Sequence, residues 1–460
     1  MRKIVFLLVL ILLVLILSFV YQVMSNIIGG PKIYPITYIN IGGTQKAICF
    51  TPDGKYFYVT HGNNLVSKVN ISSNRTVSII ALNGTLTFGG QPVISGGNLY
   101  VGTALKNYTL LTWNNGTVVK VQTADLSNWE RINHFSGTVE TIWTESTVFA
   151  INDTNDTIVS AVQVPGEIEE IVPSKGGRFI YILSLNETGL NGNLDTLTYG
   201  KSIFTIVDTQ TKKVVATFLV GSPAKFGFTT DDMFLDSNGN IYLNGIDTNQ
   251  TYVFNTSTNA FARNISVNSF KITGSPNGKY IYVIPSLGQA LYAINTSTDK
   301  IAWQVPFKNS AVLSLAVSPN GKYLYVSIWS KNDTMILNAT SGAVVKNIKI
   351  RNPFEVTFSS SLEYAYIWPG INTSAVIMLN TITNNEAAHF FIPMSIYSST
   401  AEPFYYQSGN YSYDISLGNK IYVYDSNPNH LIFLVLLNYV LALLNLILIV
   451  VVLAVIFKVK

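Results

Sequence analysis

The most informative stretch of the sequence reads Ser318-Pro319-Asn320-Gly321-Lys322-Tyr323-Leu324-Tyr325-Val326. It occurs in near-identical form twice more, at residues 51–59 (TPDGKYFYV) and 275–283 (SPNGKYIYV). Proline presets the entry of a tight turn and glycine accepts positive φ, while Tyr-x-Tyr-Val alternates with the period of a strand. Each copy therefore predicts the start of a β-hairpin, and degenerate copies near residues 95, 173, 236 and 361 extend the series.

A second signature follows about 20 residues later, as in Asn295-Thr296-Ser297-Thr298-Asp299, and an alternating apolar run comes after it. Two hairpins in about 40 residues make four strands, which is the content of one propeller blade. We therefore expect an all-β fold: a β-propeller of about eight four-stranded blades, with seven or nine as the alternatives. The predicted units span 44–83, 86–122, 128–164, 167–220, 222–268, 269–308, 311–350 and 353–392, and strands at 32–41 and 394–424 are expected to close the ring together.

The two signatures together resemble the YVTN-type β-propeller repeat of archaeal and bacterial surface proteins. The namesake tetrapeptide is present only as Tyr58-Val59-Thr60-His61, and elsewhere the match is to the pattern of the repeat. The resemblance covers most of residues 33–424 and implies a surface propeller. It implies little about activity, since propellers carry unrelated functions.

The chain begins Met1-Arg2-Lys3 and then runs from Ile4 to Val20 without a charge. This pattern predicts a signal peptide or signal anchor within residues 1–29, and the poor Ala-x-Ala match at residues 23–25 leaves cleavage open. A second uncharged stretch runs from Leu431 to Phe457, which is long enough to cross a bilayer and contact its lipid.

Lysines 458 and 460 follow the second stretch, so residues 458–460 are expected on the cytoplasmic side, as are the basic residues at the start of the chain. Residues 30–425 are then an extracellular propeller and 426–457 a linker with a transmembrane helix. The protein would cross the cell membrane once, or twice if the N-terminal helix is retained. Asn438, Ala442 and Asn445 fall on one face of the C-terminal span, where they would pair with another helix or bond their own backbone.

Sixteen sites fit the Asn-x-Ser/Thr pattern for N-glycosylation, and none lies in a predicted membrane span. Some occupy the second signature, where the family pattern carries Asp; others, at residues 107, 186, 249, 332 and 372, are expected between second and third strands on the opposite face of the ring. An Asn in a turn can also simply cap it. The sites are Asn70, Asn74, Asn83, Asn107, Asn115, Asn152, Asn155, Asn186, Asn249, Asn255, Asn264, Asn295, Asn332, Asn338, Asn372 and Asn410.

Composition excludes several classes of protein. Without the four basic residues at its ends, the chain carries 25 basic and 25 acidic residues, so it offers no positive surface for nucleic acid. Cys49 is the single cysteine and lies in an apolar strand, which favours a buried thiol and excludes disulfides within the chain. The histidines match no metal-ligand spacing, and no haem-attachment motif is present, so we expect neither a metal nor a cofactor; they are His61, His134, His389 and His430.

Two clusters of acidic residues are the candidate catalytic residues if the protein is an enzyme. Glu167, Glu169 and Glu170, or Asp231 with Asp232, could supply the carboxylate pair of a glycosidase, although solvated strand ends are the simpler interpretation. The segment 152–156 is similar to a calcium loop but lacks its glycine and its later glutamate, so a glycosylated turn is expected.

These patterns lead to a first hypothesis: a membrane-anchored, N-glycosylated propeller of an archaeal cell envelope, with a structural, binding or adhesion role and no enzymatic activity. Its partners would be envelope proteins or glycans, or a second copy bound through the C-terminal helix. The alternatives are a surface hydrolase or lactonase-like enzyme with carboxylates at the central channel, and an electron-transfer module.

Overall fold

The computed structural model describes residues 34–444 with gaps, the longest at 87–91, 123–136, 186–201, 221–232, 392–404 and 415–419; beyond residue 434 it describes only residues 436, 437, 440 and 444. The predicted N-terminal segment 1–29, the tail 458–460 and the positions Asn438, Ala442 and Asn445 therefore lie outside the described residues. So does most of the predicted membrane span. Among the residues that are described, no helix has the length and apolar character needed to cross a bilayer.

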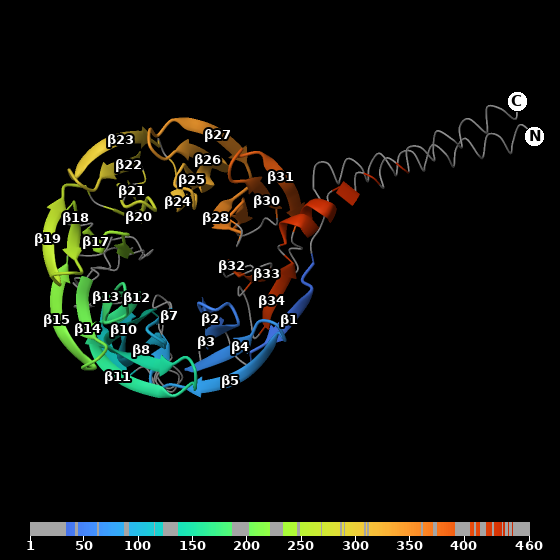
Figure 1. The fold of residues 1–460 in the computed structure, drawn as a ribbon. Coiled ribbons are helices and arrows are strands. Elements are labelled where there is room, and N and C mark those ends of the chain that lie inside the picture. The colour runs from blue at the N-terminus through green and yellow to red at the C-terminus, as the bar shows by residue number, and fades with distance from the viewer. Residues whose placement is uncertain are drawn as a thin grey trace, which may run out of the picture.

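Eight antiparallel sheets stand around a central axis and form a closed ring (Figure 1). We number these blades from the first complete sheet. Blade 1 contains β2 (Gln45–Phe50), β3 (Tyr56–His61), β4 (Leu65–Asn70) and β5 (Arg75–Ala81). Blade 2 contains β6 (Thr85–Leu86), β7 (Val93–Ser95), β8 (Asn98–Trp113), β9 (Val118–Gln122), β10 (Gly137–Asn152) and β11 (Ile158–Pro165).

Blades 3 to 5 each contain four consecutive strands. Blade 3 has β12 (Glu167–Pro173), β13 (Phe179–Leu185), β14 (Ser202–Asp208) and β15 (Lys213–Val220). Blade 4 has β16 (Met233–Leu235), β17 (Asn240–Gly245), β18 (Gln250–Asn255) and β19 (Ala260–Ile265). Blade 5 has β20 (Lys271–Gly274), β21 (Tyr280–Ile284), β22 (Ala290–Asn295) and β23 (Lys300–Pro306).

The remaining blades complete the ring. Blade 6 has β24 (Val312–Val317), β25 (Tyr323–Ile328), the 3-10 turn η2 (Trp329–Lys331), β26 (Asp333–Asn338) and β27 (Val344–Lys349). Blade 7 has β28 (Pro353–Phe358), β29 (Tyr364–Pro369), β30 (Ala375–Asn380) and β31 (Glu386–Phe391). Blade 8 has β32 (Tyr405–Ser408), β33 (Tyr411–Asp414), β34 (Lys420–Asp425) and β1 (Thr37–Asn40).

The predicted number of blades, eight, is confirmed, but the predicted residue ranges of the blades are wrong in one part of the ring. Residues 86–122 and 128–164 do not form two blades, because β8 and β10 are 16 residues long and pair with each other over most of their length. They belong to a single six-stranded sheet. The eighth blade is instead the closing sheet, in which β1 pairs with β34 as expected, Tyr38 lying opposite Tyr422.

The first turn of each clear repeat forms as its residues predict. Gly321 adopts φ 69°, and its N–H donates to the carbonyl of Ser318 at 2.8 Å. The Ser318 hydroxyl accepts the N–H of Tyr323 at 2.9 Å, which closes the loop across the Pro-Asn-Gly corner. Gly54 and Gly278 adopt the same positive φ at the equivalent positions.

The hydrophobic core is divided among the junctions between blades. Each of the eight junctions holds its own cluster of buried side chains in the described part of the chain. The second tyrosine of the repeat is at the centre of several clusters, and Tyr58, Tyr181, Tyr282 and Tyr325 are fully buried. Because each cluster contains residues of two sheets, no blade can bury its apolar surface alone.

The buried tyrosine also forms a hydrogen bond to a turn of the next blade, which we call the latch. The hydroxyl of Tyr325 donates to Asn384 Oδ1 at 2.8 Å, and that of Tyr181 donates to Asn259 Oδ1 at 2.9 Å. Both asparagines have φ near 50° in the turn between third and fourth strands. The turn of one blade therefore supplies the acceptor that the buried hydroxyl of the preceding blade requires.

The latch predicts a measurable loss of stability. Asn384→Gly keeps the left-handed turn but removes the acceptor of the buried Tyr325 hydroxyl, so unfolding should require about 1–3 kcal/mol less free energy. The matched control is Asn74→Gly, at the equivalent left-handed position of blade 1, where the asparagine side chain makes no hydrogen bond to described residues. In protein made without glycans, denaturant unfolding should separate the two variants, and equal stabilities would contradict the latch.

Candidate functional site

The connections between first and second strands and between third and fourth strands lie on the same face of the ring, because successive strands are antiparallel. We call this the turn face. Its turns are joined in pairs: in blade 5 the N–H of Thr296 donates to the Lys279 carbonyl at 3.0 Å, and the Thr296 hydroxyl donates to the Gly278 carbonyl at 2.6 Å. This explains why Thr so often follows the Asn or Asp of the second signature.

The last residue of each third strand caps the turn that follows. Asn255 Oδ1 accepts the N–H groups of Ser257 and Thr258 at 2.9 and 3.2 Å. Asn338 Oδ1 accepts those of Thr340 and Ser341 at 2.9 and 3.0 Å. At the same place, Asn152, Asp208 and Asn380 also accept two backbone N–H groups. Asn70 and Asn295 accept one each, from Ser73 and Ser297.

The cap uses the amide oxygen and leaves the nitrogen available. Asn255, Asn295 and Asn338 make no hydrogen bond through Nδ2 to the described residues, and Nδ2 is the atom to which an N-linked glycan is attached. The hydroxyl two positions on can lie close to the amide: that of Ser297 donates to Asn295 Oδ1 at 2.7 Å. Capping and glycan acceptance are therefore compatible at one residue.

The sequons of this turn are unevenly distributed around the ring. The capping residue begins Asn-x-Ser/Thr in blades 1, 2, 4, 5 and 6. In blade 3 it is Asp208, and in blade 7 Asn380 is followed by Thr381 and Ile382, which breaks the pattern. In blade 8 the equivalent residue is Asp425, where the chain leaves the ring.

The other predicted sites are spread over the molecule. Asn74 and Asn155 lie in turns between third and fourth strands, Asn83 follows β5, and Asn264 is exposed on β19. Asn249 and Asn332 lie between second and third strands as expected, both with positive φ. Asn107 was predicted in such a connection, which is wrong: it lies within β8, opposite Trp143, because that strand is longer than its repeat suggests. The sites outside the described residues are Asn115, Asn186, Asn372 and Asn410.

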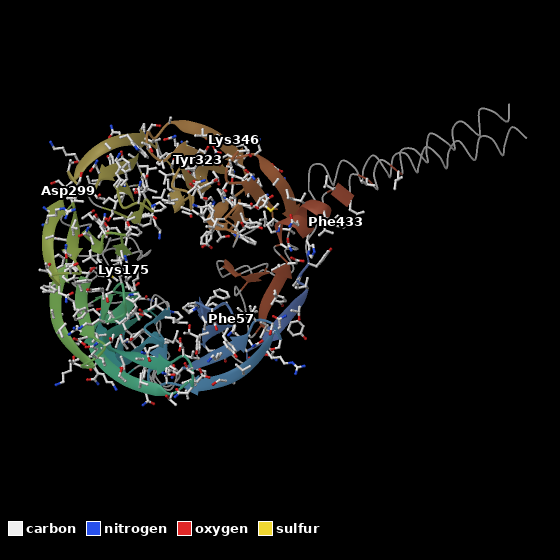
Figure 2. All side chains as sticks on the ribbon, in the orientation of Figure 1. Phe57, Lys175, Asp299, Tyr323, Lys346 and Phe433 are labelled. Carbon is white, nitrogen blue, oxygen red and sulfur yellow. The ribbon has the colours of Figure 1, made fainter. Side chains whose placement is uncertain are left out.

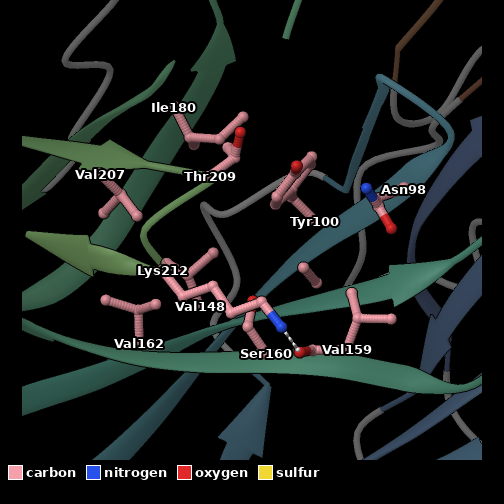
Figure 3. Close-up of a pocket in the computed structure, with 11 residues that line it drawn as sticks. Asn98, Tyr100, Val148, Val159, Ser160, Val162, Ile180, Val207, Thr209 and Lys212 are labelled. Carbon is pink, nitrogen blue, oxygen red and sulfur yellow. Dashed lines mark hydrogen bonds between the residues drawn. The ribbon is translucent and has the colours of Figure 1, made fainter. Parts of the chain in front are cut away.

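A cavity of about 210 Å³ lies at the junction of blades 2 and 3 (Figure 3). Tyr100, Thr209, Ser160 and Asn98 contribute polar groups, and valine, alanine and isoleucine side chains form the remaining walls. Lys212 occupies the left-handed turn position here, where neighbouring blades have Asn or Asp, and its Nζ donates to the Val159 carbonyl at 2.8 Å. Comparison of the aligned repeats could have revealed this substitution, which sequence analysis missed.

The first strands of the blades surround the centre of the ring (Figure 1), and one of them carries an unusual carboxyl group. Burial raises the pKa of half-buried Glu355, on β28, from its ordinary value of 4.5 to about 7, and Lys271 on β20 partly opposes the rise. Sequence analysis did not select Glu355, because no repeat signature surrounds it.

The predicted acidic candidates fall into two groups, of which the structure describes one. The residues Glu167, Glu169 and Glu170 lie on β12, and Glu170 Oε2 accepts the N–H of Met233 at 2.6 Å, which links blades 3 and 4. Asp231 and Asp232 lie outside the described residues.

The cysteine and the histidines are dispersed. Cys49 lies on β2, and burial raises the pKa of its thiol to about 11, which fits the expected structural role. His61 is buried, with Nε2 2.9 Å from the Ser67 hydroxyl, whereas His389 and His430 lie near blades 7 and 8; His134 lies outside the described residues. No group of three potential metal ligands occurs among the described residues.

The segment 152–156 forms a turn with a side-chain cap. Asn152 Oδ1 accepts two backbone N–H groups, and Asp156 Oδ1 accepts from the Lys68 ammonium at 2.9 Å and from the Tyr58 hydroxyl at 3.0 Å. The Lys68 side chain is almost fully buried. The carboxylate thus serves the contact between blades 1 and 2.

Comparisons with known proteins give structural neighbours only. No family model matches the chain, and no curated protein matches it. Solved structures similar to it include BamB from Moraxella catarrhalis (13% identical, TM-score 0.46, covering 71% of this chain and 83% of BamB). Another is Kuenenia stuttgartiensis hydrazine synthase (14% identical, TM-score 0.43, covering 76% of this chain and 96% of that chain). At these values neither likeness bears on the function of this chain.

The carboxyl group at Glu355 predicts a pH dependence of stability. Between pH 4.5 and about 7 the folded state keeps the proton that the unfolded state has lost, so the free energy of unfolding should fall as pH rises through this range. Glu355→Gln should remove this component. Thermal unfolding of both proteins from pH 4 to pH 8 should show curves that diverge as pH rises, with the wild type becoming the less stable; parallel curves would contradict the raised pKa.

Proposed function

We propose that this protein is an N-glycosylated β-propeller displayed on the outer side of the cytoplasmic membrane of an archaeal cell envelope, with a structural, binding or adhesion role. The observation that carries the proposal is the capped turn. Five blades place a sequon asparagine at the same exposed turn, with the oxygen bound to backbone and the nitrogen available for a glycan. Turn stability alone gives no reason for Asn there, because Asp208 makes the same two backbone hydrogen bonds.

A glycan coat would also compensate for an unusually uncharged surface. Charged residues form only 12% of the chain, so bulky hydrophilic sugars would supply hydration that charged side chains do not. Glycans on the turn face and at Asn249 and Asn332 would cover both faces of the ring. This arrangement favours a spacing or protective role with few bare surfaces for contact.

A hydrolase remains the second candidate, because Glu355 is a carboxyl group with a pKa close to neutrality near the central axis. Glycoside hydrolysis would require a second carboxyl group within about 5–10 Å of the first. Glu355→Gln should abolish such an activity and should leave a binding or structural role unchanged.

The glycan proposal is tested by matched asparagines in the same turn. Glycopeptide mass spectrometry of native protein should find Asn255, Asn295 and Asn338 modified and Asn380 unmodified, because Asn380 has the same cap without the sequon. Changing Asn295 to Asp should alter stability by only a few tenths of a kcal/mol. Removing all three acceptors should lower solubility. Unmodified asparagines at all four positions would remove the main support for the proposal.

Membrane anchoring is tested by truncation. Deleting residues 435–460 keeps Leu431, which is 2% exposed and part of a core cluster, but removes most of the uncharged stretch. The truncated protein should be secreted into the medium in folded form. A truncated form that stays with the membrane would indicate that residues 4–20 also anchor the chain, and a full-length chain that protease cannot reach in intact cells would reject the outward orientation.

A further inference from the structure

Blade 8 differs from the other blades because its third strand does not return as a fourth. Asp425, at the end of β34, occupies the capping position, and its Oδ1 accepts the N–H of Asn427 at 2.9 Å. Its Oδ2 lies 2.6 Å from His430 Nδ1. Instead of turning, the chain enters a helix over residues 428–434, so the helix starts where the other blades carry the capped turn between third and fourth strands.

The first turn of this helix packs against the hydrophobic core between blades 7 and 8. The side chain of Leu431 is 2% exposed and packs with Tyr366, Trp368 and Tyr424 at the junction of blades 7 and 8. Ile432 is partly buried against the same cluster, but farther along the helix Phe433 is 60% exposed and Leu436 is 56% exposed. Figure 2 shows Phe433 on the part of the helix that extends outward from the ring.

A second exposed apolar strip lies on the neighbouring strand. Along the segment that leads into and forms β1, Tyr34, Ile36 and Tyr38 are 62%, 55% and 54% exposed, in alternate positions. Tyr38 lies directly opposite Tyr422 in the sheet, so the two side chains share one face. Tyr422 packs against the cluster that contains Leu431. The strip and the helix are therefore on the same side of blade 8.

The turn between third and fourth strands carries no sequon in the two blades on this side, blades 7 and 8. Neither Asn380 of blade 7 nor Asp425 of blade 8 begins a sequon, whereas five of the other six blades have one at this position. In blade 7 the hydroxyl position of the sequon is taken by Ile382, which is 66% exposed. Ile382 adds an exposed apolar side chain where five other blades have the hydroxyl residue of a sequon.

We propose that Tyr34, Ile36 and Tyr38, which we call the anchor strip, lie in the interfacial layer of the lipid bilayer, so that the ring stands on the outer edge of blade 8. The proposal rests on the proposed membrane anchoring. Lipid is the occupant favoured here because the adjacent helix over residues 428–434 is followed in the sequence by uncharged residues as far as Phe457. Tyrosine is typical of the interface, where its ring meets apolar chains and its hydroxyl meets headgroups.

A lipid-quenching experiment tests the anchor strip in the full chain. Ile36→Cys would be labelled with a fluorophore in a Cys49→Ser background and reconstituted in phosphatidylcholine vesicles that contain a nitroxide-labelled lipid. The matched control is Ile79→Cys on β5 of blade 1, because Ile79 is similarly exposed at 60%. Quenching by the lipid should be at least twice as strong at position 36, and quenching by aqueous iodide should be stronger at position 79.

The possible outcomes test the position of the anchor strip separately from the membrane anchoring of the chain. If the protein floats with the vesicles but position 36 is quenched only by iodide, the strip faces water and the proposal is wrong while the anchoring stands. Shielding of position 36 from both quenchers would show that protein covers it, residues 4–20 being the nearest candidate in the chain, and this would also overturn the proposal. A protein that does not float at all would reject both the anchoring and the strip.

Discussion

The turn between third and fourth strands depends on one interaction: a side-chain oxygen of Asn or Asp that accepts the backbone N–H group two or three residues on, and in most blades accepts both. Strand pairing leaves these N–H groups without a partner, and the cap satisfies them locally. The cap also brings a left-handed residue to the edge of the blade, where Asn259 and Asn384 accept the buried tyrosine hydroxyls of the preceding blades. A local turn thus contributes to the contact between sheets at the junctions of blades 3 and 4 and of blades 6 and 7, beside the apolar cluster that each junction contains.

The parts of the fold that were predictable are those encoded within a few residues. Pro-Asn-Gly with Tyr-x-Tyr-Val specifies one hairpin, and Asn-Thr-x-Thr specifies the other, so six of the predicted units correspond closely to blade 1 and blades 3 to 7. The error in blade 2 arose where those signatures are weak. There the pairing of β8 with β10 continues past the normal blade length, and strand length depends on partners that are distant in sequence.

Some candidate sites were likewise predictable from local sequence, and others were not. Acceptor asparagines could be found from the sequence because a sequon and a turn are both local patterns. Lys212 and Glu355 could not, because their importance comes from neighbours in other blades: the cavity at Lys212 needs the walls of blade 2, and the raised pKa of Glu355 needs burial within the assembled ring. The anchor strip likewise depends on the pairing of β1 with β34, which joins the two ends of the propeller.

The central claim is that one asparagine both caps a turn and carries a sugar. A high-resolution structure of the native, glycosylated protein tests it most directly at Asn295. The account predicts density for a sugar joined to Nδ2 while Oδ1 still accepts the N–H of Ser297, which is 2.9 Å away in the unmodified side chain. A bare Asn295, or a glycosylated side chain rotated away with the cap broken, would contradict it.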